Sequence, residues 1–331
     1  MTKVTMFCPV CDSNEFNLLN SIFDDRYGEP NLYNLAKCTE CNHISTYPRL
    51  KNESLEDLYS EYYPRKEVEI NSIIENAKKS INIFAPILRW FNGTNNQGQF
   101  IAKKGERLLD FGCGDGTSLL EAKFNGVEAF GIETDSNVKT IAEALDLNIF
   151  FGTEIEKAFT GEYFDLVVLN QVLEHTPNPV EILNQLKQKL KPNGQIVVVI
   201  PNSESIWQKI TKLKWINWHV PYHLHHFNRK NFSFMIDKIN LSIKSCKTIT
   251  PTIWTLMQIL SFKKQSTFGK KNTLWVKNSN SKVNANNKIF NKIFKKIIYL
   301  FPLLILSSLN RLIDLFGFGD SLMFILTIKQ K

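Results

Sequence analysis

Four of the six cysteines lie in two CxxC pairs near the beginning of the sequence. Cys8 and Cys11 form the first pair, and after 26 residues Cys38 and Cys41 form the second. Two such pairs on separate turns can supply four thiolates in a tetrahedron, the ligand set of a zinc ribbon. Because cysteine fills all four positions, we expect a structural Zn2+ with no site for a water. Disulfides and unrelated free thiols are the alternatives, and we expect the neighbouring His43 to lie at the surface.

A second chemical pattern is RLLDFGCGDGTSL, which begins at Arg107. An apolar run leads into Asp110, and glycine then alternates at Gly112, Gly114 and Gly116 before a segment that favours helix. This order predicts a buried strand, a tight turn and the N-terminus of a helix. Glycine lets a ligand approach the backbone, and the free N–H groups of the helix face the same space. We therefore expect an anionic or zwitterionic small molecule to bind there.

Four segments in order carry a family resemblance. LLDFGCGDGTSL resembles the cofactor loop of class I methyltransferases that depend on S-adenosylmethionine (SAM), of the type 11 and type 23 groups. GIETDS, FDLVVLNQVLEHTPNP and LKPNGQIVVVIPN resemble the later motifs of that family, over roughly Gly105 to Ser245. The resemblance implies an α/β fold with a Rossmann-like, doubly wound, seven-stranded sheet, with SAM as the methyl donor.

The resemblance also assigns cofactor-binding positions. Asp110 would accept from the ammonium of SAM, Glu133 would accept both ribose hydroxyls, and Thr134 would border the adenine. The remaining candidates line the backbone bed or end the fourth strand: Gly112, Cys113, Gly114, Asn170 and Gln171.

Histidine is concentrated in WHVPYHLHHF, and His175 lies in LEHTP. A histidine near its unperturbed pKa is suited to remove a proton from a hydroxyl during methyl transfer. The P-x-H-L-x-x-F pattern around His223 resembles the family, so we expect His223, and after it His175, to be catalytic. A role in holding the loop by hydrogen bonds is the alternative. A metal site is not expected, because no nearby carboxylate or cysteine completes a ligand set.

Hydrophobic periodicity predicts the elements that position these residues. We expect strands near 107–111, 128–132, 148–151, 164–169, 195–200 and 241–248, helices near 116–124, 136–146, 179–190 and 229–239, and a turn at 192–194. The predicted organisation is a zinc ribbon (1–50), a helical connector or lid (51–100), a SAM-binding domain (101–250), a basic loop with an apolar helical insert (251–319) and a final strand (320–331).

The net charge of +8 is unevenly distributed. Residues 238–313 contain fourteen Lys or Arg and no acidic residue, so the rest of the chain carries −6. We expect a mobile loop over 263–288 and an apolar helix over 289–318. This insert can be a packed helix, a subunit contact or a membrane-binding surface, because basic residues beside apolar ones favour anionic lipids. A solvated lysine face is the alternative.

These observations together predict an enzyme. We expect O-methylation, or else C-methylation, of a sugar, polysaccharide precursor, lipid or other small-molecule acceptor. The alternatives are an rRNA methyltransferase whose ribbon contacts RNA, less favoured because no basic stripe interleaved with aromatics is clear, and a non-catalytic zinc-ribbon interaction protein. Without a secretory signal or a membrane span, we expect a cytoplasmic protein, with peripheral contact at the inner face of the membrane through 288–318. The acceptor atom and the oligomeric state stay open.

Overall fold

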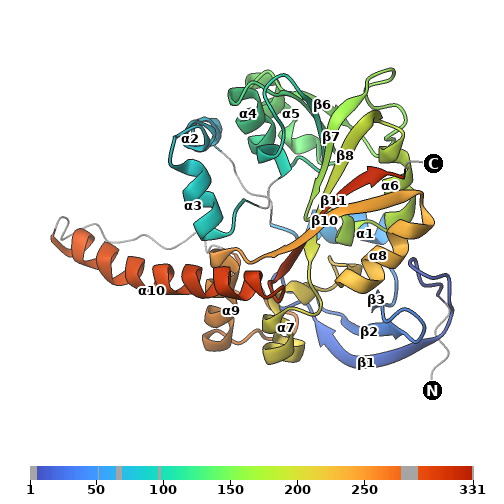
Figure 1. Ribbon diagram of the computed structural model, residues 1–331. Coiled ribbons are helices and arrows are strands. Elements are labelled where there is room, and N and C mark those ends of the chain that lie inside the picture. Colours follow the sequence, from blue (N-terminus) through green and yellow to red (C-terminus); the bar gives the residue numbers. More distant parts are fainter. Residues whose placement is uncertain (1–5, 51, 65–68, 96–97, 277–289, 330–331) are drawn as a thin grey trace.

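A seven-stranded sheet lies at the centre of the computed structural model, with a four-stranded sheet at one side of it (Figure 1). The structure describes residues 6–50, 52–64, 69–95, 98–276 and 290–329. The strands of the large sheet are β4 (Arg107–Phe111), β5 (Glu128–Glu133), β6 (Asn148–Phe151), β7 (Phe164–Asn170), β8 (Leu190–Pro201), β10 (Leu241–Ile249) and β11 (Ser321–Ile328).

The strand order of the large sheet is β10-β11-β8-β7-β4-β5-β6. β11 runs antiparallel to both of its neighbours, and the β8-β7-β4-β5-β6 pairings are parallel. The chain starts in the middle at β4, moves outward to β6, and returns to the other side at β7. This confirms the predicted doubly wound sheet and its antiparallel final strand. The direction of winding reverses between β4 and β7, where ligands of such sheets bind at the carboxyl ends of the strands.

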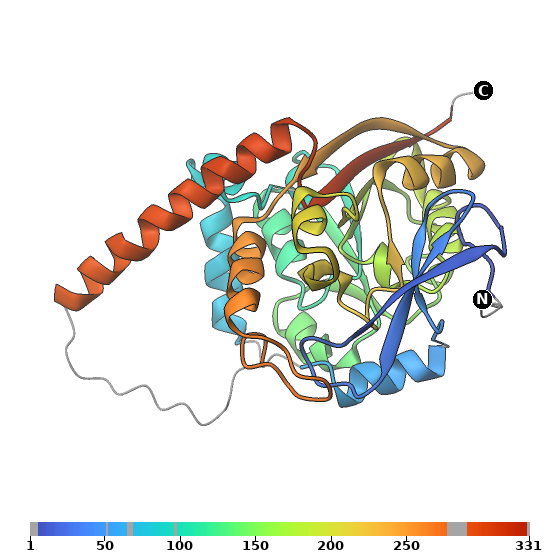
Figure 2. The same ribbon diagram turned by 90° about the horizontal axis from the view of Figure 1, so that it is seen from below.

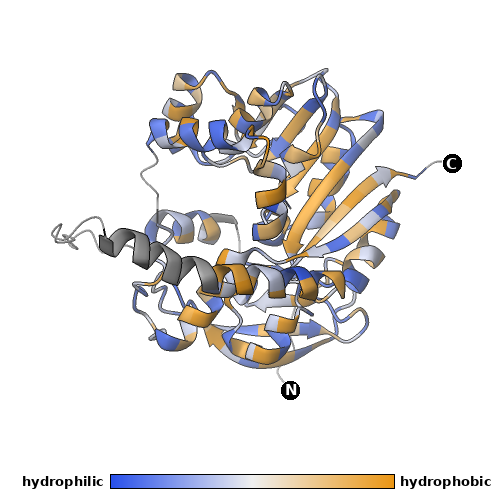
Figure 3. Cartoon of the chain, turned by 60° about the vertical axis from the view of Figure 1, so that its left-hand side comes forward, coloured by the Kyte–Doolittle hydropathy of each residue, from blue (hydrophilic) through white to orange (hydrophobic). Residues whose placement is uncertain are grey.

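Apolar side chains on both faces of these strands make the core (Figure 3). Leu109 faces the cluster that includes α6 (Pro179–Lys187) and α8 (Arg229–Lys238). Leu108 faces the opposite cluster, which includes α4 (Thr117–Phe124). Successive residues of a strand point to opposite faces, so a strand covered on both sides reads as a continuous apolar run. The run in RLLDF is therefore a consequence of burial on both sides.

The four-stranded sheet has the order β1-β2-β3-β9. β1 (Phe16–Phe23), β2 (Leu32–Cys38) and β3 (Ile44–Tyr47) come from the N-terminus, whereas β9 (His225–His226) comes from the loop after β8. Figure 2 shows these N-terminal strands crossing beside the main sheet. The N-terminal region is thus joined to the rest of the chain by strand pairing, which links Ile44 to His226 and Ser45 to His225.

The other helices are α1 (Asn52–Glu61), α2 (Ile70–Ser80), α3 (Ala85–Asn92), α5 (Lys139–Ala144), α7 (Ile206–Thr211), α9 (Thr252–Lys263) and α10 (Phe290–Leu315). α10 lies beside α3 and α9 and extends away from the sheets (Figures 1 and 2). Within the described residues, no helix is both long and apolar enough to cross a membrane.

Three local predictions need correction. The segment 192–194 is not a turn before a strand, because β8 already begins at Leu190 and absorbs these residues in a register shift against β7. His43 is fully buried rather than at the surface. Of the predicted mobile loop, residues 277–288 lie outside the described residues. Residues 263–271 are mostly exposed, but Asn272 is buried and Trp275 is half-buried. There the guanidinium of Arg26 stacks 4.0 Å from the ring centre of Trp275.

Candidate functional site

The glycine turn follows the carboxyl end of β4, beside the place where the direction of winding reverses between β4 and β7. Gly112 has a φ of 77°, and a Cβ there would lie 2.6 Å from the side chain of Val172, which follows β7. Any larger residue would force the two loops apart. Gly114 has a φ of 55°, and a Cβ there would meet nothing within 4 Å. One glycine therefore permits close packing, and the other leaves room for a ligand.

A cavity of about 210 Å³ lies against this turn. It is lined by Gln99, Asp110, Gly112, Cys113, Asp115, Thr117, Ser118, Glu121 and Asn170. Four of the residues proposed from the sequence are in this set, and the linker residue Gln99 and the first turn of α4 complete it. Ser118 was not predicted from the sequence, although its position in the first helical turn after the glycines could have indicated that it lines the site.

Asp110 is the carboxylate at the end of β4 that lines this cradle. It is buried, and its carboxylate accepts a hydrogen bond from the hydroxyl of Ser118. Burial raises the pKa of Asp110 to about 7, and the nearby negative charge of Glu133 adds to that increase. A cationic ligand would remove the cost of this buried charge, so the cradle is suited to an ammonium group.

Glu133 ends β5 and faces the same turn. Its two carboxylate oxygens accept from three backbone N–H groups: Gly114 at 2.7 Å, Thr134 at 2.7 Å and Asp135 at 3.0 Å. The carboxylate thus fixes the glycine turn. Its partial exposure leaves it accessible to a ligand's hydroxyls.

The two candidates at the end of β7 differ in their orientation. Asn170 lines the cavity, and its buried Oδ1 has no hydrogen-bond partner among the described residues. Gln171 has a φ of 57°, and its amide donates to the hydroxyl of Ser321 at 3.4 Å. Gln171 is therefore engaged with β11, whereas Asn170 presents an unused acceptor to the cavity.

The histidines predicted to be catalytic meet just after β7. His175 ends the short helix η3 (Leu173–His175), and its ring centre lies 4.6 Å from that of His223, at an interplanar angle of 84°. Burial lowers the pKa of His175 to about 4 and that of His223 well below its ordinary value. The expectation of a histidine near its unperturbed pKa is therefore wrong. Both imidazoles are neutral at pH 7.

Glu174 completes this group and corrects a second expectation. The sequence was read as lacking a carboxylate near the histidines, yet one ligand atom from each of Glu174, His175 and His223 lies within 4.8 Å of the others. Glu174 is fully buried, whereas the next residue, His175, is partly exposed. The adjacent Glu-His pair after the fourth strand was a signal that could have indicated it.

Aromatic residues from three separate segments surround the histidines. Tyr27 comes from the N-terminal region, Tyr59 and Tyr63 from α1 and the residues after it, and Tyr222 from the loop of His223. The rings of Tyr27, Tyr59 and Tyr63 each lie 5.1–5.4 Å from another ring of this set. The hydroxyl of Tyr59 lies 3.0 Å from Nδ1 of His175. Tyr62, from the predicted connector or lid, packs in the same apolar cluster.

A family comparison identifies one domain of the chain. The family model described as "Methyltransferase domain" matches residues 88–245. This range includes the strands β4, β5, β7 and β8, the glycine turn and His175. Residues 88–245 are a SAM-dependent methyltransferase domain.

Similar proteins cover only parts of this chain. A ubiquinone biosynthesis O-methyltransferase of Photobacterium profundum is 30% identical over 28% of this chain and 42% of its own length. A tRNA U34 carboxymethyltransferase of Hydrogenovibrio crunogenus is 31% identical over 30% of this chain and 35% of its own length. The chain thus spans between about a third and two thirds of the length of the curated relatives it matches.

Two solved structures were also compared. One holds the Haloferax volcanii Trm112 methyltransferase activator in complex with a putative methyltransferase (13% identity, TM-score 0.45, 80% of this chain and 100% of that chain). The other is a SAM-dependent methyltransferase from Archaeoglobus fulgidus (16% identity, TM-score 0.40, 83% and 99%).

The four predicted zinc ligands converge beside the methyltransferase domain. The four cysteine sulfurs all lie within 4.8 Å of one another. The sulfurs of Cys8 and Cys41 are 3.5 Å apart, and those of Cys11 and Cys38 are 3.4 Å apart. Bonds of about 2.3 Å to a tetrahedral Zn2+ require sulfurs about 3.8 Å apart, so the set fits the ion. Hydrogen bonding from Cys41 lowers the pKa of Cys8 to about 6.

The turns that carry these cysteines have the same form. The N–H of Asp12 donates to the carbonyl of Cys8 at 2.9 Å, and the N–H of Asn42 donates to that of Cys38 at 3.1 Å. Asp12 and Asn42 both have left-handed backbone, with φ of 65° and 59°. Asp and Asn tolerate this conformation better than most residues, which explains their position after each pair.

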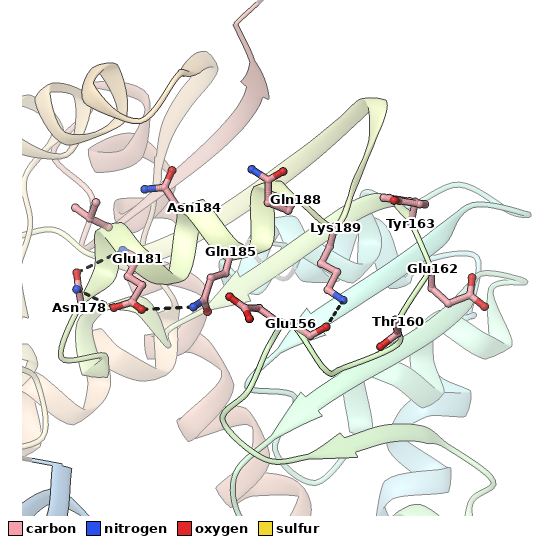
Figure 4. A pocket seen from close by; sticks show the side chains of 12 residues that line it. Glu156, Thr160, Glu162, Tyr163, Asn178, Glu181, Asn184, Gln185, Gln188 and Lys189 are labelled. Atoms are coloured by element: carbon pink, nitrogen blue, oxygen red, sulfur yellow. Dashed lines mark hydrogen bonds between the residues drawn. The ribbon is translucent and has the colours of Figure 1, made fainter.

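A larger groove of about 660 Å³ lies away from the cradle, between α6 and residues 156–163 (Figure 4). Several of its polar side chains are engaged with nearby groups: Asn178 bonds to Glu181, and the ammonium of Lys189 donates to the carbonyl of Glu156 (Figure 4). The same ammonium donates to the carbonyl of Ala158. No residue of the cradle or of the histidine group lines it, so size alone does not make it the site of methyl transfer.

Proposed function

We propose that this chain transfers a methyl group from SAM to an oxygen atom of a sugar, polysaccharide precursor, lipid or other small molecule, with carbon as the second choice of acceptor atom. The observation that carries the proposal is the pair of carboxylates at the cradle. Asp110 is buried where it can meet an ammonium, and Glu133 is partly exposed where it can meet hydroxyls. SAM carries both kinds of group.

The proposed reaction asks little of the protein beyond positioning. An oxygen lone pair of the acceptor attacks the methyl carbon, the carbon–sulfur bond breaks, and its electron pair remains on sulfur to give S-adenosylhomocysteine. The hydroxyl proton leaves during this displacement. Holding two reactants in line can contribute roughly 7–11 kcal/mol toward the barrier. Cys113, Gly114, Thr134, Asn170 and Gln171 are proposed to complete the SAM site.

We propose that the histidine group receives the acceptor. His223, and after it His175, are the candidates to accept the hydroxyl proton, since both imidazoles are neutral and close together. The tyrosines around them offer flat apolar faces with polar edges, which suit a sugar or an aromatic ring.

A structural Zn2+ in the N-terminal cysteines is part of the proposal. The four sulfurs would saturate the ion, so its role would be to hold the two cysteine turns and the strands between them. Tyr27 reaches the aromatic cluster from this ribbon. We propose the division into a ribbon (1–50), a connector (51–100), a SAM-binding domain (101–250), an insert (251–319) and a final strand (320–331), with β9 shared between the ribbon and the SAM-binding domain.

An exposed apolar surface supports a lipid or a lipid-linked acceptor. Ile83 and Ile87 beside or on α3 are 84% and 65% exposed, and Leu315 and Phe316 at the end of α10 are 80% and 69% exposed. The two helices contact each other, where the guanidinium of Arg311 donates to the carbonyl of Trp90 at 2.8 Å. A cytoplasmic chain that touches the inner face of the membrane here would meet such acceptors.

Nucleic acid is the second candidate acceptor. The basic segment 238–313 supports it, as does the relative named for tRNA U34 carboxymethylation. Binding to RNA would then weaken steeply with salt, because each phosphate contact releases counterions.

The deciding experiment is calorimetric titration of the full chain with SAM, followed by assay of S-adenosylhomocysteine release with hydroxylated sugars, lipids and RNA. Binding with release on the small-molecule set supports the proposal. Release on RNA alone favours the second candidate, and a folded chain that binds no SAM favours a non-catalytic interaction protein.

A further inference from the structure

We propose that Glu174, His175 and His223 bind a divalent first-row transition cation, which would take acceptor oxygen atoms in its remaining positions. The role toward an acceptor rests on the proposed function, whereas the cation site itself rests on these three side chains alone.

The carboxylate is the first line of evidence. Glu174 has no exposed surface, and neither carboxylate oxygen has a hydrogen-bond partner among the described residues. A buried carboxylate without a partner is costly, and natural proteins pair such groups with a cation or a hydrogen-bond donor. A bound cation would supply the missing partner.

The tautomers of the two histidines are the second line of evidence. Nδ1 of His175 lies 3.0 Å from the carbonyl of Tyr222, and Nδ1 of His223 lies 2.8 Å from the carbonyl of Asn217. A carbonyl can only accept, so an Nδ1 that bonds to one carries the proton. The hydroxyl of Tyr59, also 3.0 Å from Nδ1 of His175, would then be a second acceptor for that proton. Each Nε2 then keeps a lone pair. Metal-binding histidines are usually held this way, with the second nitrogen donating to a backbone carbonyl or a carboxylate.

Distances allow a common centre. The three ligand atoms lie within 4.8 Å of one another. If the three atoms form an equilateral triangle with sides of 4.8 Å, the centre of the triangle lies about 2.8 Å from each atom. Bonds from a first-row cation to imidazole nitrogen or carboxylate oxygen are about 2.0–2.2 Å. An inward movement of less than about 1 Å would complete the site. His175 is the partly exposed member, so the open positions would face the side from which an acceptor enters.

The donor set indicates the kind of ion. Two imidazoles and one carboxylate suit Zn2+, Fe2+, Co2+ or Ni2+ better than the oxygen-seeking Mg2+ and Ca2+. Three protein ligands leave positions open, unlike the closed set of four cysteines. A hydroxyl bound to such an ion loses its proton more readily, so the proton could pass to solvent without a protein base. With a cation present, His175 and His223 would be ligands rather than bases.

The test is to add Co2+ to the full chain after its cysteine site has received one equivalent of Zn2+ and a weak chelator has removed Zn2+ from weaker sites. We expect one Co2+ per chain to bind with weak visible bands and without the intense charge-transfer absorption of a thiolate ligand. Glu174→Gln keeps the shape of the side chain and should weaken Co2+ binding at least tenfold. His223→Gln should do the same. Glu181→Gln, an exposed change on α6, is the matched control and should bind Co2+ as the parent chain does.

Folding and the proposed function are followed separately. The melting temperature shows whether each variant is folded, and calorimetry with SAM shows whether the cradle works. No saturable Co2+ binding by the folded parent chain, or equal binding by folded Glu174→Gln and His223→Gln variants, overturns the cation site. If the chain binds SAM but not Co2+, the cation site fails and the methyltransferase proposal stands. If it binds Co2+ but not SAM, the methyltransferase proposal fails and the cation site stands.

Discussion

Nε2 of His43 lies 3.2 Å from Nδ1 of His225, and this contact joins the cysteine-bearing region to the methyltransferase domain. Both histidines are buried, and burial lowers the pKa of His43 well below its ordinary value and that of His225 to about 3. The pair is therefore neutral, with one nitrogen donating to the other. Since β3 pairs with β9 at the same place, backbone and side chains support one junction.

This junction can be tested by a double-mutant cycle. We expect His43→Ala and His225→Ala each to lower the free energy of unfolding by about 2–4 kcal/mol, because each change leaves a cavity and an unpaired nitrogen. The double variant should lose less than the sum, by roughly 0.5–3 kcal/mol, as contacting residues do. Denaturant unfolding measures all three values. Strict additivity would show that the two rings do not interact in solution.

Tightly bound zinc, which resists a weak chelator, should depend on the clustered cysteines. Cys41→Ser should reduce bound Zn2+ from one ion per chain in the cysteine site to nearly none, and should lower the melting temperature, because the ion holds the two cysteine turns together. Cys246→Ser on β10 is the control, since Cys246 does not belong to the cluster. Measurement by elemental analysis should use protein treated with a weak chelator. Full zinc retention by Cys41→Ser would contradict the proposed site.

The ribose-binding role of Glu133 predicts a large loss of SAM affinity. Glu133→Gln should raise Kd roughly 10- to 150-fold, since a hydrogen bond to a charged group contributes about 1.5–3 kcal/mol. Glu128→Gln, at the exposed start of the same strand, should change it little. Because Glu133 also fixes the glycine turn, circular dichroism must show that the variant is folded. An unchanged Kd would remove Glu133 from the cofactor site.

Asp110 should make SAM binding depend on pH. Its pKa is raised to about 7 by burial, and the neighbouring Glu133 charge acts in the same direction while the Ser118 hydroxyl opposes it. Below pH 7 the unliganded carboxyl holds a proton that must leave before an ammonium can bind. Affinity should therefore fall up to about tenfold per pH unit as pH decreases from about 7.

The same carboxyl makes the opposite contribution to folding. Its folded-state pKa is above the ordinary value of 3.8, so the folded chain binds the proton more strongly. This contribution to stability is present at low pH and declines as pH rises through about 7.

Calorimetric titration with SAM from pH 5.5 to 8 checks the predicted pH dependence of SAM binding. Asp110→Asn should bind SAM weakly with no such slope, and a slope that survives in this variant would assign the titration to another group.

The apolar surface of α3 and α10 predicts lipid binding. The full chain should co-sediment at low salt with vesicles that contain phosphatidylserine. Ile83→Glu with Ile87→Glu should reduce the bound fraction severalfold, because charged residues resist insertion among lipids. Leu32→Glu, which changes an exposed apolar residue of the N-terminal sheet, should not reduce it. Equal binding by both variants, or none by the parent chain, would contradict this role.

Residues close in sequence determined most of what could be predicted. The strand and helix periods, the glycine turn after Asp110 and the two CxxC turns all depend on local backbone preferences and on which side chains avoid water. The same applies to the strand β11, since an apolar run of five residues, Leu322 to Leu326, near the end of the given sequence favours a buried strand.

Only the tertiary structure decided which distant residues meet. In the folded chain, His225 and His226 form a strand of the sheet that the N-terminal strands make. Tyr27 lies among the rings around His223, and Glu174 is buried beside two histidines. The sequence shows that Glu174 and His175 are adjacent, but not that a loop almost fifty residues later brings His223 to them. Burial then sets their protonation, because the charged form of a group depends on surroundings that are built by the whole fold.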